Sequence, residues 1–163
     1  MSTQSITIIE ADFENPDHRD AAVRLIDAYS RDPMAAGEAL KPHVYAELGE
    51  ALRAFPTKTV FLALSGESPV GVCVCFLGFS TFYARPLLNV HDLGVLEECR
   101  GKGVGAALLD AAEEKARELG CCKLTLEVFD NNPARRLYER SGYRQYVLGT
   151  GEAGKALFYS KTL

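Results

Sequence analysis

Hydrophobic positions along the chain fall into two patterns, and the first predicts β-strands. In these stretches hydrophobic residues alternate with other residues or run together over a short length. The stretches are 5–12, 58–65, 70–80, 87–95, 122–129, 143–149 and 155–162. Because only the tetrapeptide GESP separates 58–65 from 70–80, we expect this pair to form a hairpin.

The second pattern places hydrophobic residues at helical spacing. It covers 16–30, 43–55, 104–119 and 133–142. Asn15 followed by Pro16, and Asn132 followed by Pro133, are typical of an N-cap and a first helical position. Gly120 is placed to end the third helix. The order of elements predicts an α/β or α+β fold, and the length of 163 residues predicts one domain over 1–163.

Composition narrows the class of protein. A net charge of −4 argues against a nucleic-acid partner, which usually needs a basic surface. No apolar run approaches the length of a spanning helix, and the N-terminus lacks the basic and apolar regions of a secretory signal. We therefore expect a cytoplasmic protein with no membrane contact. With no export signal we expect the five cysteines to be reduced thiols. Cysteines in CVC and CC lack the spacing of zinc ligands, so we expect no metal.

The stretch CRGKGVGAALLD, residues 99–110, carries the clearest chemical signal. Gly101, Gly103 and Gly105 alternate with other residues immediately before and within the start of the predicted helix, and Arg100 and Lys102 add positive charge. Glycine lets backbone N–H groups approach a ligand, and a helix start leaves N–H donors unpaired. Together these features predict an anion site, typically for a phosphate group.

The motif alone leaves alternatives open. A P-loop requires Ser or Thr after the lysine, and Lys102 is followed by Gly103. The letters GKGVGA satisfy the dinucleotide-binding pattern, but that pattern normally lies in the first strand–helix turn of a longer parallel series. A flexible loop before a core helix is the remaining alternative.

Two segments together resemble one family, the GCN5-related N-acetyltransferases (GNAT superfamily). LGVLEECRGKGVGAALL is similar to the family's signature after its fourth strand, through Arg100, Gly103 and Gly105. VFDNNPARRLYERSGY is similar to the next conserved segment of the family, through Asn131, Ala134, Tyr138, Gly142 and Tyr143. The resemblance implies a mixed, mostly antiparallel sheet of about seven strands flanked by four helices and splayed between strands four and five.

The resemblance also implies acetyl-CoA as co-substrate. A bulge in strand four turns backbone groups toward the pantetheine arm in this family. Gly94 stands where that bulge belongs, so Leu93, Gly94 and Val95 are the expected contacts. The pyrophosphate is expected at the backbone N–H groups of Gly101, Lys102, Gly103, Val104 and Gly105, next to Arg100. Asn131, Ala134 and Tyr138 complete the expected cofactor-binding set.

Two residues are the expected catalytic groups. Tyr138 is expected to give a proton to the leaving thiolate, the alternative being an ordinary packed aromatic ring. FSTFYARPLLNVHDLGV resembles the diamine and polyamine acetyltransferase branch, but His91 replaces its usual Glu while Asp92 matches its Asp. An imidazole can act as a base near neutral pH, so His91 is the expected base, the alternative being a packed or solvent-bridging strand residue. Strand alternation places Asp92 on the opposite face from His91, unless a bulge resets the register.

The sequence thus predicts an N-acetyltransferase that moves an acetyl group from the thioester to a primary amine by direct attack in a ternary complex. The acceptor is expected to be a small-molecule amine or a peptide amine. A non-catalytic CoA-binding regulatory module is the alternative. Dimers are common in the family, which makes a homodimer one expectation. The region 16–56, expected to line the acceptor site, carries no recognisable signature.

Overall fold

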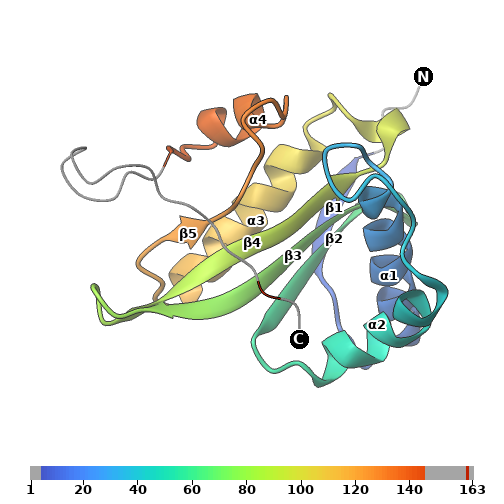
Figure 1. Ribbon diagram of the computed structural model, residues 1–163, viewed down its shortest axis with the longest axis horizontal. Coiled ribbons are helices and arrows are strands. Elements are labelled where there is room, and N and C mark those ends of the chain that lie inside the picture. The colour runs from blue at the N-terminus through green and yellow to red at the C-terminus, as the bar shows by residue number, and fades with distance from the viewer. Residues whose placement is uncertain (1–4, 146–160, 162–163) are drawn as a thin grey trace.

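The computed structural model describes residues 5–145 and residue 161 (Figure 1). Its elements in chain order are β1 (Ile6–Glu10), α1 (Pro16–Ser30), α2 (Pro42–Ala54), β2 (Lys58–Ser65), β3 (Ser68–Ser80), β4 (Arg85–Val95), a 3-10 turn (Glu97–Cys99), α3 (Val104–Glu118), β5 (Leu124–Thr125) and α4 (Arg135–Arg140). The predicted helices and the first four predicted strands are therefore present close to their expected bounds.

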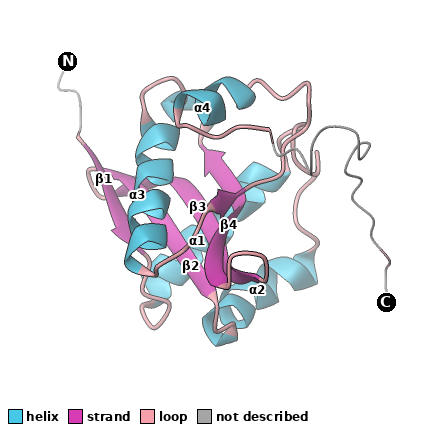
Figure 2. Cartoon of the chain, turned by 90° about the vertical axis from the view of Figure 1, so that its left-hand side faces the viewer, coloured by secondary structure: helices cyan, strands magenta, loops and turns pink. Residues whose placement is uncertain are grey.

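The five strands form one sheet in the order β1-β2-β3-β4-β5. Neighbours from β1 to β4 are antiparallel, whereas β5 pairs with β4 in parallel. Helices α1 and α2 lie on one face of the sheet, and α3 and α4 lie on the other (Figures 1 and 2). This arrangement confirms the α+β fold with a mixed, mostly antiparallel sheet and four helices.

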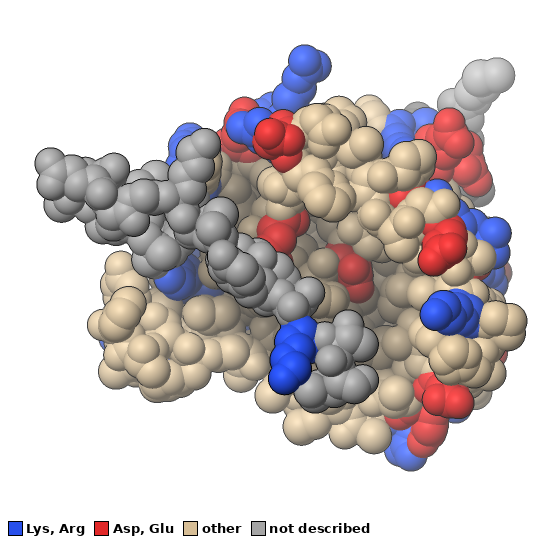
Figure 3. All heavy atoms as spheres, viewed as in Figure 1, with Lys and Arg blue, Asp and Glu red and all other residues tan. Residues whose placement is uncertain are grey.

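Charged side chains are distributed unevenly on the face seen in Figure 1. Most lie around its rim, and acidic side chains also lie in the hollowed middle (Figure 3).

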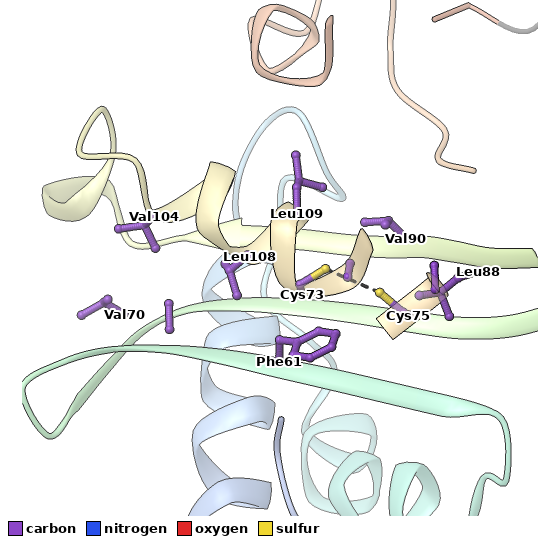
Figure 4. Packing of buried hydrophobic residues seen from close by; sticks show 12 residues of the cluster. Phe61, Val70, Cys73, Cys75, Leu88, Val90, Val104, Leu108 and Leu109 are labelled. Atoms are coloured by element: carbon purple, nitrogen blue, oxygen red, sulfur yellow. Dashed lines mark hydrogen bonds between the residues drawn. The ribbon is translucent and has the colours of Figure 1, made fainter. Parts of the chain in front are cut away.

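Beneath this surface the sheet separates two hydrophobic clusters. The cluster between α3 and the sheet includes Cys73 and Cys75, whose sulfur atoms are 3.6 Å apart (Figure 4). The other cluster packs α1 and α2 against β2 and β3.

The strand predicted at 122–129 is much shorter in the structure. Only Leu124 and Thr125 pair with β4, and residues 126–129 have no strand partner among the described residues. Five of the roughly seven expected strands are present among the described residues. The predicted strands 143–149 and 155–162 lie almost wholly outside these residues, and residues 143–145 are not in a strand.

Helix α4 also begins later than expected. The Asn132 side chain accepts a hydrogen bond from Ala134 N at 2.9 Å, so it caps a turn as predicted. However, Pro133 lies within that turn, and the regular helix starts at Arg135. By contrast, Asn15 caps α1 by accepting from Asp17 N at 2.9 Å, with Pro16 in the first turn as predicted.

The turn between β3 and β4 holds a strained residue. Ala84 has φ of 50°, the only positive φ among the described residues other than glycine. Because the left-handed region costs an L-residue roughly 1–2 kcal/mol, Ala84→Gly should raise the free energy of unfolding by about 1 kcal/mol. Urea denaturation measures this change. Ala51→Gly in the exposed face of α2 is the matched control and should lower stability by about 1 kcal/mol. A loss of stability in Ala84→Gly would contradict the prediction.

Candidate functional site

Strand β4 loses its neighbour part of the way along. It pairs with β5 only through Leu88 opposite Leu124 and Asn89 opposite Thr125. Beyond Asn89 no described strand lies beside β4 on that side, and the chain after β5 turns toward α4 (Figure 1). The predicted splay between strands four and five is therefore present. We call the segment His91–Val95 the open edge of β4.

The register of β4 shifts at His91. Asp92 lies opposite Val74, but Val90 lies opposite Cys75, so His91 is the extra residue. The bulge expected at Gly94 is thus three residues earlier, and pairing through Gly94 and Val72 is regular. The extra residue changes which face each side chain takes.

The shift brings two polar side chains to one face. Val90 and Leu93 both belong to the cluster beneath α3, although three positions separate them. His91 and Asp92 lie between them on the face that carries α1. Strand alternation had placed these two side chains on opposite faces, and the bulge overturns that expectation.

Gly94 is required by helix packing. A Cβ atom at this position would lie 2.9 Å from Cβ of Tyr29 in α1, closer than real Cβ atoms approach. The glycine therefore lets α1 approach the open edge of β4, and this contact holds Tyr29 over it. At Gly105 a Cβ would lie 2.9 Å from Cδ2 of Leu137 in α4, the end of a flexible side chain that can move aside, so the constraint there is weaker.

The glycine loop, residues 101–105, leads into α3 through left-handed backbone. Gly101 has φ of 71° and Gly103 has φ of 83°, and a Cβ on either would meet open space. Ala107 N donates to the Gly103 carbonyl. No described backbone carbonyl accepts from the N–H groups of residues 101–106. These unpaired donors at a helix start can bind an anion, as the sequence predicts.

The two basic side chains of this segment are held by protein partners. Arg100 donates from Nε to the Val95 carbonyl at 3.0 Å and from a terminal nitrogen to Asp32 at 2.9 Å. Lys102 Nζ donates to the Glu98 carbonyl at 2.7 Å. Arg100 therefore connects the end of β4 to the turn after α1.

A cavity of about 510 Å³ lies beside Arg100. Its walls are the C-terminal end of α1 with the following turn, and the segment from Gly94 to Arg100. Tyr29 and Asp32 line it from the α1 side. Of the residues predicted to bind cofactor, Gly94, Val95 and Arg100 line this cavity, while the glycine loop lies next to it in sequence.

Tyr138 lies half-buried on α4, where its N–H donates to the Ala134 carbonyl at 3.1 Å. Burial raises the pKa of Tyr138 to about 12, with smaller contributions from Tyr29 and Cys73. Its ring packs edge-on against Tyr143 at 6.1 Å. Tyr138 is therefore a neutral phenol over the physiological pH range. Asn131 of the predicted set is exposed in the turn before α4.

Asp92 is a half-buried carboxylate without a hydrogen bond or close ion pair to any described residue. Burial raises its pKa, and the neighbouring His91 partly offsets that effect. His91 is exposed and packs edge-on against Phe76 with ring centroids 5.3 Å apart. A carboxylate with a raised pKa and no partner can accept a proton from a ligand.

The sequence placed the region 16–56 at the expected acceptor site but gave no role to Tyr29 or Asp32 within it. Burial raises the pKa of Tyr29, and the negative charges of Asp92 and Asp32 raise it further. Tyr29 occupies an ordinary position near the end of an amphipathic helix, so no local pattern marks it. Its contact with Gly94 depends on tertiary packing.

Two other properties of the described part of the chain bear on function. No helix within it is long and apolar enough to cross a membrane. No group of three or more His, Cys, Asp or Glu side chains within it is arranged to hold a metal ion.

Comparison with known proteins gives the family. The sequence profile of the Acetyltransferase (GNAT) family matches residues 22–143. The chain is 34% identical over 85 residues to an aminoalkylphosphonate N-acetyltransferase of Salmonella typhimurium, a match covering 52% of this chain and 55% of that one. It is 28% identical over 131 residues to a thialysine N-epsilon-acetyltransferase of Caenorhabditis elegans, covering 78% of each chain.

The first curated relatives that it matches are covered over only about half of their length. Among solved structures, an aminoglycoside N-acetyltransferase in complex with CoA is similar with a TM-score of 0.73 at 15% identity, covering 96% of this chain and 95% of that chain. This structural likeness supports the fold alone. Since the family profile matches well over half of the chain, the protein belongs to the GNAT family of acetyltransferases.

Proposed function

We propose that the protein is an acetyl-CoA-dependent N-acetyltransferase that transfers acetyl to a primary amine by direct attack in a ternary complex. The observation that carries the proposal is the set of unpaired N–H groups of residues 101–106 at the start of α3, next to the open edge of β4. Family membership and the CoA bound to a structural neighbour support the choice of donor.

The glycine loop and the open edge of β4 suit the acyl donor, acetyl-CoA. The six consecutive N–H groups of 101–106 offer donors to a diphosphate, and the glycine loop carries no Cβ at three of these positions. The open edge of β4, with Leu93, Gly94 and Val95, offers backbone groups to an amide-containing arm. Asn131 and Ala134 border the arm's path near α4 in this proposal. Bound there, acetyl-CoA supplies an activated acyl group.

His91 and Asp92 act together as the base in this proposal. A primary alkylamine with a pKa near 10.4 is neutral in only about one part in two thousand at pH 7, which adds roughly 4–5 kcal/mol to the barrier. Asp92 accepts the ammonium proton because its raised pKa brings it closer to the amine and no described side chain competes for it. His91, exposed beside it, passes the proton to solvent.

Tyr138 supplies the proton for the leaving thiolate. Its half-buried phenol stays protonated until the pH approaches about 12. It packs against the hydrophobic cluster on the α3 side of the sheet, which Leu93 and Val95 of the open edge also contact. The base and the acid thus approach the open edge from opposite faces, which keeps the two proton transfers separate.

A cationic acceptor suits the surface around the site. The cavity beside Arg100 includes the carboxylates of Glu97 and Glu98, which form no ion pair with a described residue, whereas its two arginines are already paired with Asp27 and Asp32. The relatives named above act on an aminoalkylphosphonate and on thialysine, and the structural neighbour on aminoglycosides. These substrates share an amino group, so the proposed acceptor is a small-molecule or peptide primary amine in the cytoplasm.

A panel of such amines tests the proposal. The protein is incubated with acetyl-CoA and each amine, free CoA is measured with a thiol reagent, and the acetylated product is identified by mass spectrometry. We expect at least one amine to release CoA and gain one acetyl group in equal amounts. Tight acetyl-CoA binding with no amine-dependent release across the panel would favour a non-catalytic CoA-binding module instead.

A further inference from the structure

The turn after α1, residues 31–38, is organised around Asp32. Its carbonyl accepts from Ala35 N at 2.8 Å and from Gly37 N at 3.1 Å, and its Oδ1 accepts from Met34 N at 2.8 Å. Its own N–H donates to the Tyr29 carbonyl at 3.0 Å. A single residue therefore fixes the path of this turn, which forms one wall of the cavity.

The second oxygen of Asp32 leaves the turn and binds Arg100. The Oδ2 atom accepts from an Arg100 terminal nitrogen at 2.9 Å, while Arg100 Nε donates to the Val95 carbonyl. The Asp32 side chain is 21% exposed and the Arg100 side chain is 53% exposed, so the pair is open to solvent on the Arg100 side. The contact joins segments that lie 68 residues apart in the chain.

Arg100 retains the capacity to bind an anion while it holds Asp32. A guanidinium has five N–H donors, and two are used here, which leaves three. Arg100 directly precedes the glycine loop. An anion at that loop would share Arg100 with Asp32, and planar guanidinium groups suit such bridging between oxyanions.

We propose that Asp32 is a positioning residue that couples the donor site to the acceptor wall. Through Arg100 it transmits the binding of the CoA diphosphate to the turn 31–38, so that the wall of the acceptor cavity is fixed when the donor is bound. This inference rests on the proposed function. The inference adds that acetyl-CoA and the acceptor each strengthen the binding of the other. Asp32 mediates this coupling without touching the reacting atoms.

Hydrogen exchange measured by mass spectrometry tests the coupling without any turnover. Peptides from the glycine loop and from the turn 31–38 are followed with and without acetyl-CoA. In the wild type we expect acetyl-CoA to slow exchange about fivefold or more in both segments. In Asp32→Asn, which keeps an oxygen for Met34 N, we expect slowing at the loop but not at the turn. Arg100→Gln, which leaves the turn's own hydrogen bonds intact, should lose the effect at the turn as well.

Kinetics give a second readout. Asp32→Asn should raise the acceptor KM about fivefold while kcat at saturation and the acetyl-CoA Kd change less than twofold. The double variant Asp32→Asn/Arg100→Gln should have the same acceptor KM as Arg100→Gln alone, because the two substitutions remove the same contact. Glu113→Gln is the matched control, since it removes the same charge from the surface pair with Arg117 on α3. It should behave like the wild type in both experiments.

The outcomes separate the two proposals. The coupling would be overturned if acetyl-CoA slowed exchange at the turn as much in Asp32→Asn as in the wild type. It would also be overturned if the slowing in the wild type were confined to the glycine loop. Either result would leave the proposed function intact. Independent, multiplying effects of Asp32→Asn and Arg100→Gln on the acceptor KM would also overturn it. Absence of any change at the glycine loop would overturn the proposed donor site, and the coupling with it.

Discussion

Tyr138→Phe is expected to lower kcat for acetyl transfer by about 100-fold or more and to change acetyl-CoA affinity less than twofold. The substitution removes one hydroxyl from a half-buried ring and leaves its packing against Tyr143. A positioned acid typically contributes roughly 10²–10⁴-fold to a rate, so loss of the proton donor to the thiolate gives this effect. Initial rates with the best amine of the panel, and acetyl-CoA titration by calorimetry, measure the two quantities.

Tyr143→Phe is the matched control for this experiment. Tyr143 is the other ring of the edge-on pair with Tyr138. Its buried hydroxyl has no hydrogen-bond partner among the described residues. Removing an unpaired buried hydroxyl should leave kcat within about threefold and raise the free energy of unfolding by about 1 kcal/mol. Equal losses of kcat in both variants would contradict the role given to Tyr138.

The pH profile of the wild type gives the same assignment another test. Since Tyr138 stays protonated until the pH nears about 12, it should impose no fall in kcat/KM between pH 7 and 10. The rate should instead rise over this range as more of the amine becomes neutral. A fall in kcat/KM that begins below pH 9 with a fully active, folded protein would contradict the proton-donor role.

Asp92→Asn is expected to lower kcat/KM by about 100-fold and to raise the stability of the protein at pH 7. Asparagine has nearly the same shape but cannot take the ammonium proton, so the base contribution is lost. His91→Gln, one residue away and exposed, should cost about tenfold or less, because it removes only the path to solvent in this account. Kinetics at several pH values and urea denaturation measure both effects.

The stability gain depends on pH in a defined direction. Burial raises the pKa of folded Asp92 above the ordinary 3.8, so the folded protein binds this proton more tightly than the unfolded chain does. The charged carboxylate therefore costs stability at neutral pH, and asparagine removes that cost. Below about pH 4 both states are protonated and the gain should vanish. Full activity in this variant would contradict the base role. A variant less stable than the wild type at pH 7 would contradict the cost assigned to the buried charge.

Local sequence patterns predicted the elements that depend on local chemistry. Asn15 and Pro16 specify the start of α1 through a cap and a fixed φ, and both act as predicted. The glycine loop adopts left-handed backbone at Gly101 and Gly103 because only glycine takes that conformation without strain. The splay between β4 and β5 came from the family resemblance, which has now been confirmed by the fold and the family profile.

Features that depend on long-range contacts could not be predicted in this way. The register shift at His91 is set by pairing with β3, and a strand pattern alone cannot show which residue is the extra one. Gly94 was interpreted as the site of a bulge, whereas a glycine is needed there because Tyr29 of α1 packs closely against it. The Asp32–Arg100 pair joins distant segments, so neither residue marks the other in the sequence.

Backbone amide chemical shifts during titration with CoA test the central claim most directly. The claim is that residues 101–106 at the start of α3 bind the diphosphate and that the open edge of β4 binds the pantetheine arm. On adding CoA, the largest amide shifts should fall in 101–106 and 91–95, with saturation, and NAD at the same concentration should leave them unchanged. Largest shifts elsewhere in the chain, or equal shifts with NAD, would contradict the account.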